Sequence, residues 1–136
     1  MSVPETVDTD TSSISKFDEH IVEVKFKDGA HVKYRHAREL GEATLEISGR
    51  EKFLLLIDAT DIFGIIDPEA MDYFTTNEEL VKLRMAQAMV VNSLPIRLIA
   101  NFYMRVKKPP GEVKIFANRK DALVWLSDHR HLVSSN

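Results

Sequence analysis

The sequence predicts an α/β fold with a mixed sheet of about five strands and four to five helices. Three observations predict it. Lys52–Asp58 is a short apolar run that opens with a lysine and closes on an aspartate, typical of a strand buried on both faces in a parallel sheet. Helix-like and strand-like segments alternate from residue 35 onward, which favours parallel pairing through right-handed crossovers. Near the N-terminus, an Asp28-Gly29 turn predicts a hairpin. The predicted order is β-β-α-β-α-β-α-β-α.

The composition indicates one cytoplasmic domain that folds without a metal or a disulfide. A chain of 136 residues can bury roughly two-thirds of the surface that its unfolded form exposes. It has no cysteine, which excludes disulfides, zinc–thiolate sites, iron–sulfur clusters and cysteine nucleophiles. The first residues lack the basic and apolar regions of a secretion signal. The longest apolar segment, 86–106, is interrupted by polar and charged residues, so we expect no membrane span.

The net charge of −3 hides an uneven distribution along the chain. Residues 1–80 carry 18 acidic and 8 basic side chains, whereas residues 81–136 carry 3 acidic and 10 basic ones. This polarity can serve an acidic partner or a contact with a second copy of the chain. An ordinary solvated surface has the same pattern.

The N-terminal part predicts a leader and then two paired strands. Residues 1–15 are rich in Ser, Thr, Asp, Pro and Glu, so we expect a disordered leader before a single domain over 16–130. Apolar and polar residues alternate over His20–Lys27, which predicts a half-buried strand. We expect His31–Tyr34 to pair back onto it through the Asp28-Gly29 turn.

Two helical regions flank the central strand in the sequence. Arg35–Ser48 has apolar residues at three- and four-residue steps and ends at Gly49, a natural helix stop. Asp67-Pro68-Glu69 is a strong helix start, with Asp as the N-cap and Pro in the first turn. A second short helix begins at Thr76 or Asn77.

The C-terminal part predicts two more strand–helix units. Met85–Val91 and Glu112–Ala117 are expected strands, and Asn118 caps a last helix. A helix from Leu94 to about Lys107 precedes Pro109-Pro110-Gly111, and residues 131–136 are expected to fray. The buried stripe of this helix is expected to comprise Leu94, Leu98, Phe102 and Val106.

Several core segments carry a resemblance to a known fold. They are Phe53–Asp58, Ala86–Val91, Leu98–Tyr103, Val113–Phe116 and Ala122–Leu126. With the hairpin and the helix–strand units, they resemble, over residues 20–128, the STAS fold of bacterial anti-sigma-factor antagonists and its SEC14-like relatives, in particular small bacterial STAS-like proteins of uncharacterised function. The resemblance implies a regulatory module that acts through protein contacts, or a SEC14-like domain that binds a small ligand or lipid. Core residues indicate fold better than activity.

The chain departs from this family at the phosphorylation site. Kinase-switched STAS antagonists carry a phosphoacceptor serine or threonine in an Asp-Ser turn just after the central strand. The comparable segment here, Gly64–Glu69, has no hydroxyl side chain, and no serine occurs between Ser48 and Ser93. Thr60 is the nearest hydroxyl, at the strand exit. The comparison therefore implies a module that serine phosphorylation does not switch.

The loop after the central strand is the first candidate site, because ligands of open α/β sheets bind beyond the carboxyl ends of the strands. Asp58, Asp61 and Asp67 could hold Mg²⁺ or act as acids and bases if they converged there. Helix capping by Asp67 and backbone bonding by Asp58 explain these residues as well. The apolar residues of the loop favour a partner-binding surface, for which we expect Thr60, Asp61, Ile62, Phe63 and Asp67.

The second candidate is a basic helix face. Arg97, Asn101, Arg105 and Lys108 recur at helical spacing and share one face. Such a face can attract an acidic protein, a phosphate or a nucleic acid, although a solvated helix has the same pattern. Nucleic acid is the weakest of these hypotheses, because single-stranded binders add exposed aromatic side chains and only Tyr103 is available.

The chain contains no recognised catalytic or cofactor motif. It lacks Gly-x-Gly-x-x-Gly, a P-loop and Gly-x-Ser-x-Gly, and its histidines do not have metal-ligand spacing. We therefore expect no enzymatic activity, no cofactor and no metal. The expected partner is another protein or a second copy in a homodimer. A small ligand is the alternative, which needs a pocket of roughly 300 Å³ or more between helices and sheet.

Overall fold

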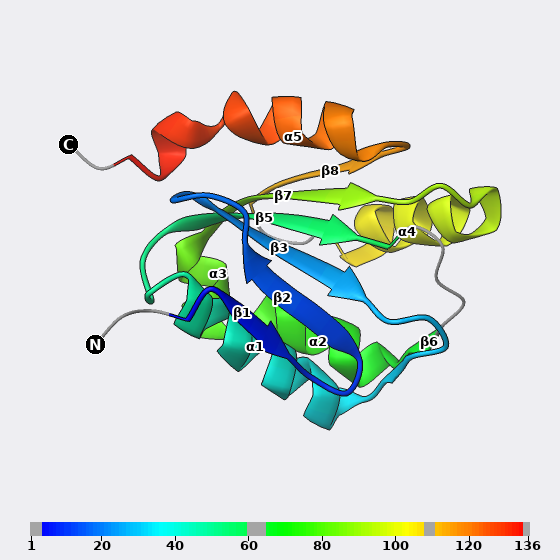
Figure 1. Cartoon of the computed structure of the whole chain (residues 1–136). Helices are drawn as coiled ribbons and strands as arrows, with labels where there is room; N and C mark the ends of the chain where they lie inside the picture. The colour runs from blue at the N-terminus through cyan, green and yellow to red at the C-terminus, as the bar shows by residue number, and fades with distance from the viewer. Residues whose placement is uncertain (1–3, 60–64, 108–110, 135–136) are drawn as a thin grey trace.

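The structure, a computed structural model, describes residues 4–59, 65–107 and 111–134 and contains a six-stranded mixed sheet (Figure 1). The strands are β1 (Thr6–Asp8), β2 (Ser12–Lys16), β3 (Ile21–Phe26), β4 (His31–Val32), β5 (Phe53–Asp58), β6 (Ile65–Ile66), β7 (Arg84–Val90) and β8 (Glu112–Phe116). The helices are α1 (Tyr34–Ile47), α2 (Pro68–Thr76), α3 (Glu78–Leu83), α4 (Leu94–Lys107), α5 (Arg119–Ser127) and the 3₁₀ turn η1 (Arg130–Leu132). The sheet order is β1-β2-β3-β5-β7-β8, which confirms the predicted α/β class with a mixed sheet.

The strand β5 lies inside the sheet, as its apolar run predicts. It pairs in parallel with β3 on one side and with β7 on the other. Leu54 and Leu56 are fully buried on one face, and Phe53 and Leu55 are buried on the other. Both faces are covered by helices, so this strand does not alternate between apolar and polar residues.

The N-terminal residues 6–16 form two strands, where the sequence predicts a disordered leader up to residue 15. β1 pairs antiparallel with β2, and β2 pairs antiparallel with β3. Ile14 is fully buried and packs in the same core as Val22 and Val24. A prediction from composition does not identify these strands. Their order comes from backbone hydrogen bonds to β3 and from the core contact of a single isoleucine. At the other end, η1 and the buried Val133 replace part of the expected frayed tail.

The predicted hairpin between residues 20–27 and 31–34 is wrong. Gly29 has a φ of 76°, but Asp28 does not have the positive φ that a primed Asp-Gly hairpin turn also needs, and the chain leaves the sheet. β4 pairs in parallel with β6 as a separate two-stranded ribbon, with His31 opposite Ile65. The antiparallel partner of β3 is instead β2. The sequence of β2 does not have the apolar pattern of a strand, so this pairing was not predicted.

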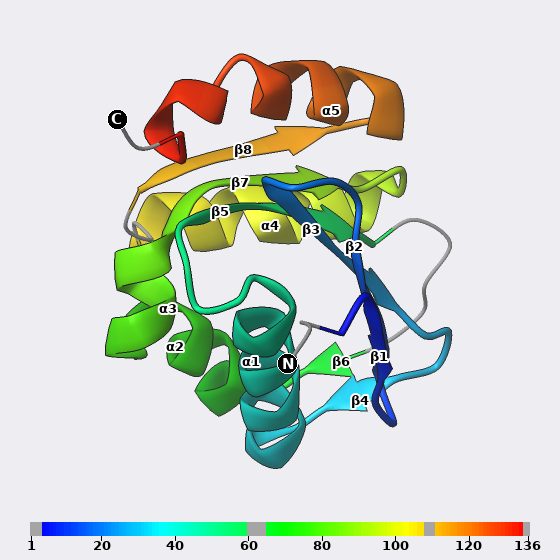
Figure 2. The ribbon, with the colours of Figure 1, turned by 60° about the vertical axis from the view of Figure 1, so that its left-hand side comes forward.

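Helices cover both faces of the sheet (Figure 2). α5 covers one face, where Ala122 and Leu126 pack against β5 and β7. α1, α2 and α3 cover the other face, where Leu40 and Ile47 enter the larger core. α4 lies on the same side as α1, because its Ala100 lines a cavity together with residues of α1 and α2.

Local signals at the helix ends are confirmed. Asn77 caps α3, since its Oδ1 accepts a hydrogen bond from the Leu80 N–H at 3.0 Å. Asn118 caps α5 in the same way, accepting from the Asp121 N–H at 2.9 Å. These caps satisfy backbone donors that the first helical turn leaves without partners, so three or four residues suffice to predict them.

Gly41 lies inside α1, where glycine normally weakens a helix. A Cβ at this position would lie 2.7 Å from Cε1 of Tyr73 and 3.1 Å from Cδ1 of Leu80. Glycine therefore lets α2 and α3 approach α1 closely. Packing between helices therefore explains why a glycine occurs inside α1, which the helical sequence pattern does not explain.

Candidate functional site

The predicted carboxylate site at the end of β5 is not assembled by the described residues. Thr60, Asp61, Ile62 and Phe63 lie outside them. Asp67 is the N-cap residue of α2, and its Oδ1 lies 2.7 Å from Nε2 of His31. Asp58 is buried on the α5 side of the sheet. Within residues 4–59, 65–107 and 111–134, no group of three or more His, Asp or Glu side chains could hold a metal ion.

An ion pair near Asp58 ties α5 to the sheet. Arg119, the first residue of α5, donates from Nη2 to Glu23 at 2.7 Å and from Nε at 3.1 Å. This pairing, with a smaller contribution from the charge of Asp58, raises the pKa of Arg119 above its usual value. The guanidinium also lies 5.3 Å from the ring centre of Phe17. Both carboxylate oxygens of Glu23 accept hydrogen bonds from Arg119, so the pair is an anchor for α5.

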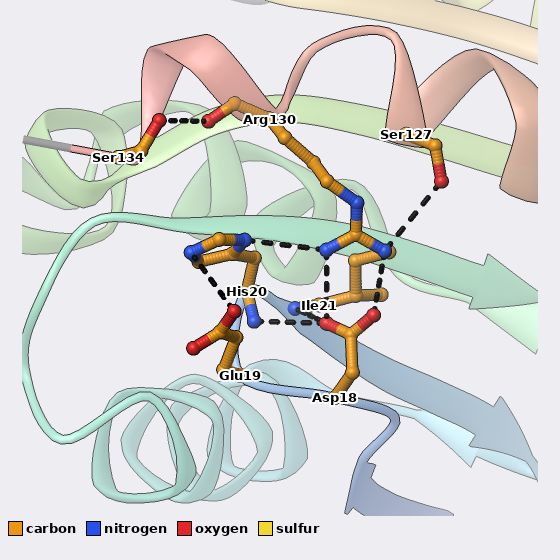
Figure 3. A network of polar contacts seen from close by, with 7 residues as sticks. All are labelled: Asp18, Glu19, His20, Ile21, Ser127, Arg130 and Ser134. Carbon is orange, nitrogen blue, oxygen red and sulfur yellow. Dashed lines mark hydrogen bonds and ion pairs between the residues drawn. The ribbon is translucent and has the colours of Figure 1, made fainter.

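A polar network joins the start of β3 to η1 (Figure 3). Arg130 donates to Asp18 at 2.6 Å and 3.3 Å, and the backbone N–H groups of His20 and Ile21 donate to the same carboxylate. Partial burial raises the pKa of Asp18, but these hydrogen bonds outweigh it and hold the pKa below its usual value of 3.8. The network lies at the amino end of β3, away from the edge where ligands of such sheets bind, so it is a structural clip.

Asp18→Asn is expected to lower the free energy of unfolding by about 1 kcal/mol at pH 7, because it removes a partly exposed, charge-assisted pair with Arg130. The folded-state pKa of Asp18 is depressed, so its contribution is present above the unfolded pKa and is lost as pH falls below about 4. Urea unfolding at pH 7 and pH 3 measures the difference, with the exposed Asp10→Asn as control. An Asp18→Asn deficit of equal size at both pH values would contradict the assignment.

The outer face of α4 carries a row of exposed apolar side chains. The row, which we call the outer stripe, comprises Leu94, Leu98, Phe102 and Val106, whose exposed fractions are 64, 60, 65 and 57%. The prediction that these residues are buried is therefore wrong. Ala100 and Met104, on another face of α4, line the interior. Apolar residues occur on more than one face of this helix, so spacing alone does not identify the buried one.

Side chains of the predicted basic face run beside the outer stripe. Arg97, Asn101 and Arg105 each follow a stripe residue by three positions, which places them next to it on the helix surface. Asn101 and Arg105 are exposed and Arg97 is half-buried. Lys108, the fourth predicted residue, lies outside the described residues. Residues 94–107 contain no Asp or Glu, so every charge that α4 itself contributes beside the stripe is positive.

An apolar cavity of about 400 Å³ lies between the sheet and the helices α1, α2 and α4. Leu55 and Met89 line it from the sheet. Leu40, Phe74 and Met104 line it from the three helices. The cavity therefore lies on the face of the sheet that also packs against the larger core. The apolar sequence pattern predicts that these lining residues are buried. It does not show whether the space between them is filled by side chains.

Two polar side chains of β7 line this cavity. Arg84 is 6% exposed, and its Nη2 donates to the Phe74 carbonyl at 2.8 Å. Gln87 is half-buried and makes no side-chain hydrogen bond within the part of the chain that the structure describes. The sequence held one signal for this site, because Gln87 interrupts the otherwise apolar run of residues 85–91.

Comparisons with known proteins identify a fold. A family model described as a domain of unknown function (DUF7793) matches residues 15–130. A solved structure, an uncharacterised DUF3478-family protein from Shewanella loihica PV-4 with a SpoIIAA-like fold, is 19% identical, covers 85% of this chain and 91% of its own, and superposes with a TM-score of 0.59. This likeness confirms the predicted STAS-like fold. No curated protein matches the chain. Among the described helices, none has the length and apolar character needed to cross a membrane.

Proposed function

We propose that this chain, which belongs to the DUF7793 family of domains of unknown function, is a non-enzymatic, STAS-like interaction module that binds another protein through the outer face of α4. The outer stripe carries the proposal. Four large apolar side chains, each more than half exposed, form one row on a single helix. A continuous exposed apolar surface with a polar border is typical of a contact site.

The chemistry of α4 favours a partner with an apolar groove and an acidic border. Residues at steps of four form a ridge along a helix, and such ridges pack into the grooves of a facing helix. Arg97 and Arg105 border the ridge without any acidic residue in the helix, so negative charge on the partner complements them. The narrowness of the row favours a protein groove over a membrane surface, where a wider apolar face inserts.

Pairing of α4 with a second copy of itself is less favourable. An antiparallel pair would place Leu98 against Phe102 of the other copy, which is apolar on both sides. The same arrangement brings Arg97 close to Arg105 of the other copy, and like charges across an interface oppose association. A hetero-partner therefore fits the surface better than a homodimer through this helix.

Site-specific cross-linking tests the proposed surface. A photoreactive amino acid replaces Leu98 in one variant and Val124, an exposed residue of α5, in the control. We expect position 98 alone to form an adduct with a second protein, through a segment rich in Asp or Glu. Arg97→Glu with Arg105→Glu should abolish that adduct. Adducts with lipid, adducts between two copies of this chain, or equal yields at both positions would overturn the proposal.

Leu98→Asp is expected to weaken binding of that partner at least about tenfold and leave the fold intact. Leu98 is 60% exposed, so the substitution should change the free energy of unfolding by no more than about 0.5 kcal/mol. Val124→Asp, a matched change at a 57% exposed site, should leave binding unchanged. Undiminished binding by Leu98→Asp at unchanged stability would exclude the outer stripe as the contact.

One observation favours a second candidate function, the binding of a small ligand. The cavity of about 400 Å³ exceeds the roughly 300 Å³ at which ligand pockets begin. Its lining is apolar with few polar groups, which is the usual composition of such pockets. This function is compatible with the first, because the cavity and the outer stripe lie on different faces of α4.

A further inference from the structure

We propose that two copies of this chain associate through the outer edge of β8, which pairs antiparallel with β8 of the second copy and joins the two sheets. The inference goes beyond the proposed function, because it concerns an edge of the sheet and not the outer stripe of α4. β8 is the last strand in the sheet order, at the opposite end from β1 (Figure 1). Among the described residues, the strand that pairs with it is β7 alone.

The backbone of β8 determines which residues can pair across this edge. The Phe116 carbonyl accepts a hydrogen bond from the Val91 N–H at 2.9 Å, so the backbone groups of Phe116 point toward β7. Successive residues of a strand direct their backbone groups to opposite sides, so Val113 and Ile115 direct theirs outward. Outward N–H and C=O groups at the edge of a sheet are a template for another strand. A second strand therefore forms its hydrogen bonds with Val113 and Ile115.

Two opposite charges lie on one face of this edge. Glu112 and Lys114 are exposed, and Oε2 of Glu112 lies 4.0 Å from Nε2 of His129, which follows α5. Nζ of Lys114 lies 5.5 Å from the ring centre of Phe116, which packs on the α5 side of the sheet. Both charged side chains therefore lie on the α5 face, two positions apart in the strand.

These charges favour one register of a symmetric antiparallel pair. With Val113 opposite Val113 of the second copy, Glu112 of each copy lies opposite Lys114 of the other. Directly opposite residues share a face, with Cβ atoms about 4.5 to 5.5 Å apart, so two ion pairs form. The outward backbone groups of Val113 then form a hydrogen-bonded pair. A pair centred on Glu112 or Lys114 brings like charges together, and one centred on Ile115 forms no ion pair.

The apolar side chains of β8 add burial to this pairing. Val113, Ile115 and Phe116 are half-buried in a single copy, so part of their apolar surface contacts water. A second strand along the edge covers some of that surface. The opposite edge of the sheet is less suited to pairing, because β1 has three residues and very short edge strands discourage association.

Charge reversal tests the proposed register, with sedimentation of the full chain over a range of concentrations as the measurement. Glu112→Lys or Lys114→Glu alone places like charges opposite each other twice, so each should raise the dimer dissociation constant at least about tenfold. An equimolar mixture of the two variants restores both ion pairs, as does a chain that carries both substitutions. The dissociation constant should then return to within about threefold of that of the natural chain.

Glu51→Lys and Lys52→Glu are the matched controls, because both residues are exposed and lie between α1 and β5. Neither should change the dissociation constant. A natural chain that stays monomeric at every concentration would overturn the proposal. So would a dimer that both single variants at β8 retain, or a mixture that associates no better than either variant alone. None of these substitutions lies on α4, so all of them leave the outer stripe intact.

Discussion

Leu56→Ala is expected to lower the free energy of unfolding by about 3 to 4 kcal/mol. Leu56 is fully buried on β5 and faces α5, in a cluster with Ala88 and Leu126. The loss combines the removed apolar contact with the cavity that remains. Parallel pairing of β5 on both sides fixes its backbone, so the surroundings can relax little to fill that space.

The same substitution on α4 is the control. Leu98 is 60% exposed, so Leu98→Ala should change the free energy of unfolding by less than about 0.5 kcal/mol. Urea unfolding of both variants, followed by circular dichroism at one protein concentration, measures the two values. Similar losses at positions 56 and 98 would show that the outer stripe packs inside the molecule, and the proposed contact surface would then fail.

The sequence predicts the elements of this fold well where the signal is local or the burial is complete. The apolar run predicted over Lys52–Asp58 forms β5, which begins one residue later and has the predicted interior place in the sheet. The helix starts at Asp67-Pro68, Asn77 and Asn118 also agree. Asn77 and Asn118 cap their helices through their side chains, whereas the side chain of Asp67 lies against His31 and makes no capping hydrogen bond. Each of these predictions uses physics that acts within one element.

The errors arise where the answer depends on a neighbouring element. β2 contains three serines and one buried isoleucine, and it becomes a strand because β3 provides its hydrogen-bond partners. The turn has a positive φ at Gly29 alone, and it leads to β4, whose partner β6 lies more than thirty positions later. The sequence predicts that β3 pairs with the segment that follows it, whereas its antiparallel partner is β2, the strand just before it.

The candidate site was predictable only in part, for the same reason. Helical spacing groups Arg97, Asn101 and Arg105 on one face of the helix, but it does not predict that the neighbouring apolar row is exposed. Asp58 is the last residue of β5 and Asp67 precedes α2, and they associate with different elements, α5 and β4. The cavity depends on the spacing between the helices and the sheet, which no linear pattern records.

Ala88→Leu is expected to lower the free energy of unfolding by about 2 to 3 kcal/mol. Ala88 is fully buried on β7, beneath α5, where the neighbouring residues Ala86 and Ala122 are also small. Three alanines at one contact let the helix lie close to the strand. A leucine at position 88 must therefore push α5 away or adopt a strained rotamer, and either change also strains the Glu23–Arg119 pair at the start of α5.

Two matched Ala→Leu variants distinguish this close contact from the space on the opposite face of the sheet. Ala117→Leu, at an exposed site, should cost less than about 0.5 kcal/mol. Ala100→Leu enters the cavity of about 400 Å³, so its side chain finds room and should be neutral or stabilising. Thermal and urea unfolding of the three variants give the order 88, then 117, then 100, from most to least destabilised. A loss at position 100 as large as that at position 88 would mean that no such cavity exists in solution, because a filled interior penalises added volume on either face of the sheet.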